Sequence, residues 1–325
     1  MPIFSGVTIS GGFSYEAPPP PVIPYVAVAV TGTNRIMTST DASTWTAVAA
    51  PEALQWRSVA YGNGTFVALS YDQDPANPYM YSTDLGATWT AASKNGASSL
   101  YGARVRFVNN QFVALYDNGT QRVQTSTDGI TWTSVTTNFN SYAPYDITYV
   151  SGTYYVVVTD NNISRARILT STDLTTWTNV ALFNVTPTSL TYGYTIQYSN
   201  GVFVVGGDNT FAFPQNNAEI VYSTDGTTWS AGTNTTTLGT RYNTVYGNGT
   251  WVSVGSGQNV ATSTDGQTWT NSATALPNNS TWTGLVYKNN KFVAVSNGGH
   301  VAYSTDGLSW TAGTAAEANG WYFIA

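Results

Sequence analysis

Seven aspartates that recur along the chain are the first residues whose spacing could support chemistry. Each stands third in a short phrase that begins Ser-Thr-Asp and ends in Trp, which we call the STD phrase, as in S-T-D-G-T-T-W at Ser223–Trp229. They are Asp41, Asp84, Asp128, Asp173, Asp225, Asp265 and Asp306. Each phrase offers one carboxylate, whereas calcium takes about six to eight oxygen ligands. We therefore predict that these aspartates are structural and that the protein binds no metal and no cofactor.

A second set of residues could bind a ligand by aromatic stacking and hydrogen bonding. Its members map to the first apolar alternation of a repeat or to the loop that enters it. They are Trp56, Arg57, Arg104, Arg106, Tyr145, Asp146, Tyr194, Gln197, Arg241, Tyr242 and Trp282. Aromatic residues on strands more often pack between sheets. Arg104, Arg106 and Asp146 are harder to assign to a core, because buried charges need partners.

Few residues could carry catalysis. The four glutamates fall in the N-terminal tail or beside turns, at Glu16, Glu52, Glu219 and Glu317. His300, the single histidine, follows a glycine turn with no evident serine or aspartate partner, so neither a triad nor a metal site is expected. Asp146 is the one acid outside the STD phrases at the start of an alternation, and glycosidase chemistry by two aspartates stays open. We predict that the protein is not an enzyme.

The elements that must position these residues follow from the repeat. Successive STD phrases begin 43, 44, 45, 52, 40 and 41 residues apart. A period of this length is typical of β-propellers. Each repeat contains four short apolar alternations. In the second repeat they are residues 56–61, 65–70, 79–82 and 88–92, and an Asn-Gly turn joins the first two. The sequence therefore predicts an all-β, seven-bladed propeller of four-stranded antiparallel blades.

The two ends of the repeated region complement each other. The chain enters the first repeat at Tyr25–Val30, which matches the second strand of a blade, and no first strand precedes it. Trp321–Ala325 follows the last phrase at the distance where other repeats place their first strand. We predict that one C-terminal strand and three N-terminal strands share a blade, because this arrangement removes two exposed sheet edges. Residues 25–325 then form a single domain.

The STD phrases resemble the Asp box, or BNR repeat, of sialidase-like β-propellers, whose pattern is S-x-D-x-G-x-T-W. Ser82–Trp89 matches it at full length, the other six phrases are one residue shorter, and those at Ser39 and Ser171 also lack the glycine. The resemblance implies the propeller fold and places the phrases away from the family's active sites. It also implies that a sialidase would need three arginines, a Tyr–Glu pair and an Asp acid/base. No glutamate is expected on a first strand to complete that set.

Composition limits the partners. The 325 residues carry a net charge of -6, with 11 Lys and Arg against 17 Asp and Glu. Nucleic-acid binding requires a basic stripe that this chain lacks, so we expect no nucleic acid partner. The longest apolar run, Tyr25–Val30, is too short to span a bilayer, so we expect no membrane insertion. No export signal or cysteine is apparent.

Residues 1–24 lie outside the repeat and contain four successive prolines at 18–21. Proline runs favour an extended polyproline II conformation. Apolar groups alternate with small or polar ones before the prolines, and the candidate anchoring residues are Ile3, Phe4, Phe13 and Tyr15. Such a peptide suits a groove or an added strand on a neighbour's sheet. We predict an anchoring arm, with a disordered linker as the alternative.

These features favour a structural interaction protein of a virion, such as a capsid decoration or tail component of a tailed bacteriophage. In this hypothesis residues 1–24 bind other virion structural proteins, the propeller faces outward, and host-surface glycans are candidate ligands. The arm also resembles, in composition, the anchoring arms of phage structural proteins. The first alternative is a free or secreted, extracellular carbohydrate-binding lectin. The second is a sialidase-like glycoside hydrolase.

Overall fold

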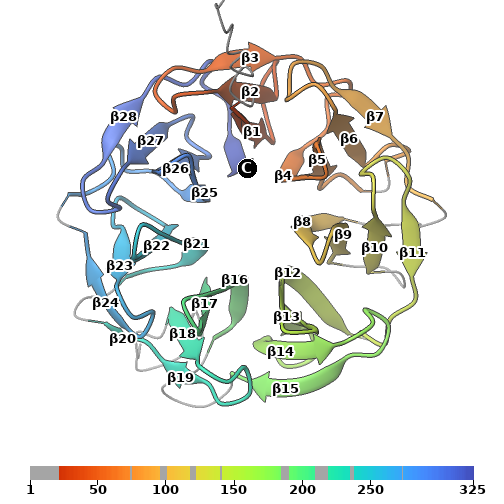
Figure 1. The fold of residues 1–325 in the computed structure, drawn as a ribbon, viewed down its shortest axis with the longest axis vertical. Helices are drawn as coiled ribbons and strands as arrows, with labels where there is room; N and C mark the ends of the chain where they lie inside the picture. The colour runs from red at the N-terminus through yellow and green to blue at the C-terminus, as the bar shows by residue number, and fades with distance from the viewer. Residues whose placement is uncertain are drawn as a thin grey trace, which may run out of the picture.

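The structure, a computed structural model, describes residues 22–73, 75–95, 101–117, 122–139, 141–183, 190–208, 219–234, 238–272 and 274–325. Its strands form seven sheets arranged as blades around a central axis (Figure 1). The prediction of an all-β, seven-bladed propeller is therefore confirmed. The candidate anchoring residues Ile3, Phe4, Phe13 and Tyr15 lie outside the described residues.

Each blade has four antiparallel strands, which follow one another from the axis outward. Blade A contains β29 (Trp321–Ile324), β1 (Tyr25–Ala29), β2 (Ile36–Ser39) and β3 (Thr46–Val48). Blade B contains β4 (Trp56–Gly62), β5 (Thr65–Ser70), β6 (Tyr79–Ser82) and β7 (Thr90–Ala92). Blade C contains β8 (Gly102–Val108), β9 (Gln111–Tyr116), β10 (Val123–Ser126) and β11 (Thr133–Val135). Blade D contains β12 (Tyr142–Val150), β13 (Thr153–Asp160), β14 (Arg165–Ser171) and β15 (Thr178–Leu182).

The remaining three blades have the same order. Blade E contains β16 (Tyr192–Ser199), β17 (Val202–Asp208), β18 (Ile220–Ser223) and β19 (Ser230–Ala231). Blade F contains β21 (Arg241–Gly247), β22 (Thr250–Gly255), β23 (Ala261–Ser263) and β24 (Thr268–Asn271), and β20 (Thr233–Asn234) adds a short parallel strand to its outer edge. Blade G contains β25 (Trp282–Lys288), β26 (Lys291–Ser296), β27 (Val301–Ser304) and β28 (Thr311–Gly313).

The ring closes through the C-terminal strand, as predicted. β29 pairs antiparallel with β1, with Phe323 opposite Val28. The Val26 amide donates to the Ala325 carbonyl at 2.9 Å, and the Ala325 amide donates back at 3.0 Å. The inner strand of blade A therefore comes from the C-terminal end of the chain. Because β29 pairs with it, β1 is not left as an exposed sheet edge.

The STD phrases form the turn between the third and fourth strands, and the six seven-residue phrases use the same hydrogen bonds, whereas in the longer phrase of blade B the Asp84 carboxylate accepts the amide and the hydroxyl of Thr88. In blade E, the Ser223 hydroxyl donates to Asp225 at 3.0 Å and accepts the Gly226 amide at 2.8 Å. The Asp225 carboxylate accepts the next two amides of the turn at 2.8 and 2.7 Å. Ala42 and Leu174 occupy the glycine position with φ of 69° and 65° and keep these bonds, so the missing glycine leaves the turn geometry unchanged.

The Asn-Gly turns join the first two strands of a blade at the same end as the STD phrases, because alternate strands run in the same direction. Asn63 adopts φ of 47° and donates its side-chain amide to the Thr127 carbonyl in the phrase of the next blade. Asn248 makes the equivalent bond to Thr305 at 3.2 Å. These asparagines therefore shape their own hairpin and link it to the neighbouring blade.

The hydrophobic core lies between neighbouring blades. Val67 and Leu69 of blade B share one buried cluster with Phe112 of blade C. Trp132, from the STD phrase of blade C, stacks on Tyr79 of blade B at 3.9 Å between ring centroids. Each blade is thus covered on both faces, which explains its apolar strands.

Candidate functional site

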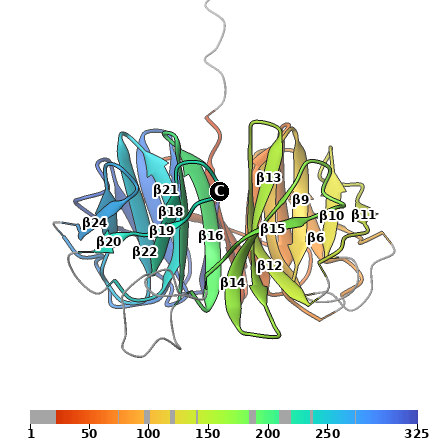
Figure 2. The ribbon, with the colours of Figure 1, turned by 90° about the horizontal axis from the view of Figure 1, so that it is seen from below.

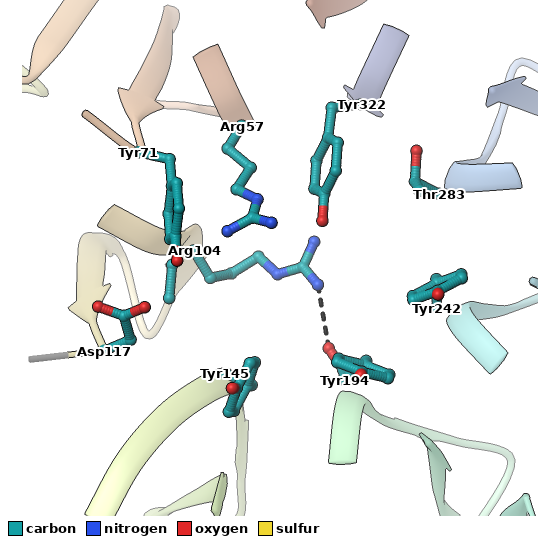
Figure 3. Close-up of a pocket in the computed structure, with 10 residues that line it drawn as sticks. Arg57, Tyr71, Arg104, Asp117, Tyr145, Tyr194, Tyr242, Thr283 and Tyr322 are labelled. Atoms are coloured by element: carbon teal, nitrogen blue, oxygen red, sulfur yellow. Dashed lines mark hydrogen bonds between the residues drawn. The ribbon is translucent and has the colours of Figure 1, made fainter. Parts of the chain in front are cut away.

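A β-bulge occurs at the same position in the inner strand of all seven blades. In each case the strand pairing skips one residue near the strand's first position. The skipped residues are Arg57, Ala103, Tyr145, Tyr194, Tyr242, Thr283 and Tyr322. Bulges re-aim side chains and are frequent beside functional sites. All seven skipped residues line one cavity on the axis, of about 70 Å³ (Figure 3).

Arg57 lies between two aromatic rings at the edge of this axial cavity. Its guanidinium is 3.8 Å from the Tyr71 ring centroid and 4.7 Å from that of Tyr322. Tyr71 ends in a hydroxyl that points toward Asp117 (Figure 3). Burial raises the pKa of the Asp117 carboxyl, and one of its buried oxygens has no hydrogen-bond partner. The cavity therefore presents both the stacked guanidinium of Arg57 and an Asp117 oxygen that lacks a hydrogen-bond donor.

Arg104 crosses the base of the cavity. Its side chain donates to the Tyr194 carbonyl at 3.0 Å, and its guanidinium lies 4.2 Å from the Phe323 ring centroid. Figure 3 shows this guanidinium in the middle of the ring of cavity-lining residues. Burial lowers the pKa of Arg104 to about 10, which still leaves it charged at neutral pH. Together with Arg57 it gives the cavity two positive charges.

Tyrosines form much of the remaining wall. The Tyr194 ring packs edge-on against Tyr145, at 5.7 Å between ring centroids, and lies tilted by 42° against Tyr242, at 5.1 Å. Burial, and then Asp117, raise the pKa of Tyr145 to about 12, and burial is also the main cause of the raised pKa of Tyr194. These hydroxyls therefore stay protonated at neutral pH and can both donate and accept hydrogen bonds.

The structure divides the ligand-binding candidates from the sequence into three groups. Five of them line the axial cavity: Arg57, Arg104, Tyr145, Tyr194 and Tyr242. Arg106 and Gln197 line a second space of about 260 Å³ in the channel, and Asp146 is buried beneath the axial cavity. The other three line neither of these two spaces. Trp56 and Trp282 are core residues with 0% exposure, and Arg241, also 0% exposed, donates to backbone carbonyls of its own blade.

Five residues of the cavity wall were not among the candidates: Tyr71, Ala103, Asp117, Thr283 and Tyr322. Tyr71 and Asp117 follow the second strands of blades B and C, a position that the repeat pattern does not single out. Tyr322 follows Trp321 as Arg57 follows Trp56, so aligning the closing strand with the other inner strands would have identified it. Only the bulge reveals why the residue after the tryptophan faces the axis.

The axial cavity and the start of the described chain lie at opposite faces of the ring. The bulges are near the first residue of each inner strand, whereas the STD phrases and Asn-Gly turns lie at the other end. β1 begins at this second end, where Tyr25 pairs with Ser39. Lys288 and Asn289 of a blade G turn hold the preceding segment by donating to the carbonyls of Pro24 and Ile23 at 2.8 and 3.3 Å. Figure 2 shows this segment joining the ring at one face.

Metal binding and membrane spanning are two further functions for which the described residues could carry a site. No group of three or more His, Cys, Asp or Glu there is placed to hold a metal ion. Within the same part of the chain, no helix is long and apolar enough to cross a membrane.

Comparison with known proteins places this fold among propellers. No protein-family model and no curated protein matches the chain. A solved structure of YCF48 bound to D1 peptide has a TM-score of 0.58 at 12% identity, covering 84% of this chain and 85% of that one. A protein from Lactobacillus plantarum reaches 0.64 at 10% identity, covering 93% and 98%. Virginiamycin B lyase from Staphylococcus aureus also reaches 0.64, at 14% identity, covering 81% and 85%. At these identities the likeness establishes the seven-bladed propeller fold and no activity.

Proposed function

We propose that the protein is a non-enzymatic interaction component of a virion. Residues 1–24 anchor it to other virion proteins, and the propeller presents its axial cavity outward. The observation that carries this proposal is the placement of the cavity and of residues 22–24 on opposite faces of the ring. A head tethered at residues 22–24 points the cavity away from its attachment without any rearrangement.

The chemistry of the cavity favours the anionic end of a glycan as the ligand. Arg57 and Arg104 supply two positive charges, and Asp117, whose pKa is raised, is the one carboxylate among the cavity-lining residues. A volume of about 70 Å³ is roughly five times what one water needs, enough for a carboxylate or sulfate group but not for a whole sugar ring. The surrounding tyrosines offer faces for the attached ring and hydroxyls for its hydrogen bonds.

The same wall argues for binding without hydrolysis. Glycoside hydrolases with two carboxylates need both beside the scissile bond. Asp117 is the single carboxylate lining the described cavity. Tyr71, its neighbour, has a pKa raised by burial and then by the charge of Asp117, which disfavours a tyrosinate nucleophile. Tyr71 and Asp117 are therefore poorly suited to act as a nucleophile and its acid/base partner in glycoside hydrolysis.

An array of acidic and neutral saccharides tests the ligand. We expect the full-length protein to retain acidic saccharides and to release no product from them. Ala103→Trp, which fills the cavity, and Arg57→Met are each expected to weaken retention at least about tenfold. Arg165→Gln, which changes an arginine outside the cavity, is the matched control. Equal retention by Ala103→Trp, or hydrolysis of a retained saccharide, would overturn this assignment.

Deletion of residues 1–20 tests the anchor separately. The truncated protein is expected to fold, to bind the same saccharides, and to be missing from purified particles. Mass spectrometry of particles assembled with the truncated chain measures its copy number against the intact chain. Incorporation at full occupancy would show that the attachment surface lies on the propeller.

A further inference from the structure

A buried charge cluster lies directly beneath the axial cavity. Arg104 and Arg106 come from β8, and Asp146 comes from β12. The Asp146 carboxylate is 0% exposed and accepts two hydrogen bonds from Arg106, both 2.7 Å long. It also accepts the backbone amide of Ile196 in β16 at 3.2 Å. A single carboxylate therefore links the inner strands of three successive blades.

Arg104 is the member of this cluster that reaches the cavity. Its Nε lies 3.7 Å from the nearer Asp146 oxygen, too far for a hydrogen bond, and this buried nitrogen has no other partner. Among the described residues, Asp146 is the one carboxylate within ion-pair distance of Arg104. The position of Arg104 at the cavity base therefore depends on the charge of Asp146, on the Tyr194 carbonyl and on the ring of Phe323.

The charges of the cluster do not balance. Burial opposes the ionisation of Asp146, but Arg106 and then Arg104 outweigh it and hold the pKa of the carboxyl below its ordinary value. One carboxylate thus faces two guanidinium groups, of which the Arg104 side chain is the more buried, at 10% exposure against 23% for Arg106. Buried charges of this kind are costly unless they are paired.

We infer that Asp146 is the positioning residue of the axial cavity: it holds Arg104 at the cavity base, where Arg104 and Arg57 receive the anionic group of the ligand. This inference rests on the proposed function for the identity of the ligand, but not for the binding of an anion. Asp146 does not touch the ligand itself, because Arg104 lies between them. Arg106, on the far side of Asp146, faces the second space of the channel.

Sulfate binding tests this inference without any saccharide. The melting temperature is measured against sulfate concentration, with chloride keeping the ionic strength constant. We expect sulfate to raise the melting temperature of the unaltered protein and of Arg106→Met, because both keep the pair of Arg104 with Asp146. Asp146→Asn is expected to lose the sulfate response, with an apparent affinity lowered at least about tenfold.

The two variants of the cluster separate positioning from general stability. Arg106→Met removes the guanidinium that forms both short hydrogen bonds to Asp146, at a side chain that is 23% exposed against 0% for Asp146, so both variants are expected to lower the melting temperature without sulfate. A merely structural role for Asp146 predicts equal sulfate responses in the two, and that result overturns the inference. Should Asp146→Asn not fold, Asp146→Glu keeps the charge but displaces Arg104, and it is expected to fold with a weakened sulfate response. An unchanged response in Asp146→Glu also counts against the inference.

The outcomes distinguish this inference from the proposed function. A sulfate response that depends on Asp146, combined with no retention of acidic saccharides, leaves the positioning role in place and removes the glycan. The absence of any sulfate response in the unaltered protein overturns the inference, because the cavity then takes no anion.

Discussion

Ring closure by β29 can be tested at Phe323. This side chain is 1% exposed and belongs to a buried cluster with Val28 and Trp56, so it packs blade A against blade B. Truncating a buried phenylalanine to alanine costs about 3–5 kcal/mol through lost burial and the cavity left behind. Domains are stable by only about 5–15 kcal/mol, so Phe323→Ala removes a large share of the total.

Deleting residues 321–325 is expected to have a larger effect. Trp321, Phe323 and Ile324 are each at most 2% exposed, and burial of such side chains contributes about 1.5–3 kcal/mol each. The deletion also removes the hydrogen bonds between β29 and β1 and leaves β1 as an exposed edge. The combined loss approaches the whole stability of the domain, so the truncated chain is expected to aggregate or to stay unfolded.

Urea unfolding followed by tryptophan fluorescence measures both changes. Tyr322→Ala is the matched control, since it alters the neighbouring residue of β29 at a half-buried position in the cavity wall. We expect its unfolding free energy to fall by less than about 1 kcal/mol. A truncated chain that unfolds at the parental urea concentration, or a Phe323→Ala midpoint equal to that of Tyr322→Ala, would refute the closure argument.

Three further predictions concern the turns at the opposite face from the axial cavity. Asp128→Ala removes the acceptor of the Ile130 and Thr131 amides, and we expect urea unfolding to show a loss of about 1 kcal/mol after solvent screening, with sulfate binding unchanged. The Thr88 hydroxyl and amide lower the pKa of Asp84 to about 2, below the ordinary value of about 3.9, so the stabilisation from this carboxylate is present above pH 4 and is lost as the pH falls toward 2. Unfolding midpoints at pH 5 and pH 3 measure this loss. Asp84→Asn is expected to abolish the part of the pH 5 to pH 3 difference that comes from Asp84. Asn248→Ala puts alanine, which tolerates left-handed backbone less well than asparagine, at a φ of 46° and removes the bond to Thr305. Thermal melting is expected to report a loss of about 1–2 kcal/mol of unfolding free energy. Asn248→Gly is expected to recover the share of this loss that comes from backbone strain.

Part of the site could be read from the sequence. The spacing of the aromatic and charged residues identified inner-strand positions, and five of the eleven candidates do line the axial cavity. The sequence could not distinguish the candidates that line the cavity from those in the core. Adjacent positions of a strand point in opposite directions, so a shift of one residue changes the environment of a side chain completely. Trp56 is in the core, whereas Arg57, the bulged residue of the same strand, faces the axis.

The sequence by itself determined the number of blades, the turn chemistry and the closing strand. Those features are local or repeated: an STD phrase contains the donors and acceptors of its own turn, and the missing first strand of one end matches the surplus strand of the other. The tertiary structure alone decided which residues meet. A bulge in each inner strand turns one side chain toward the axis, and residues 90 positions apart, Arg104 and Tyr194, become hydrogen-bonded there. The charge of Asp146 finds its partners only when three blades stand side by side, because no local pattern specifies contacts across a ring.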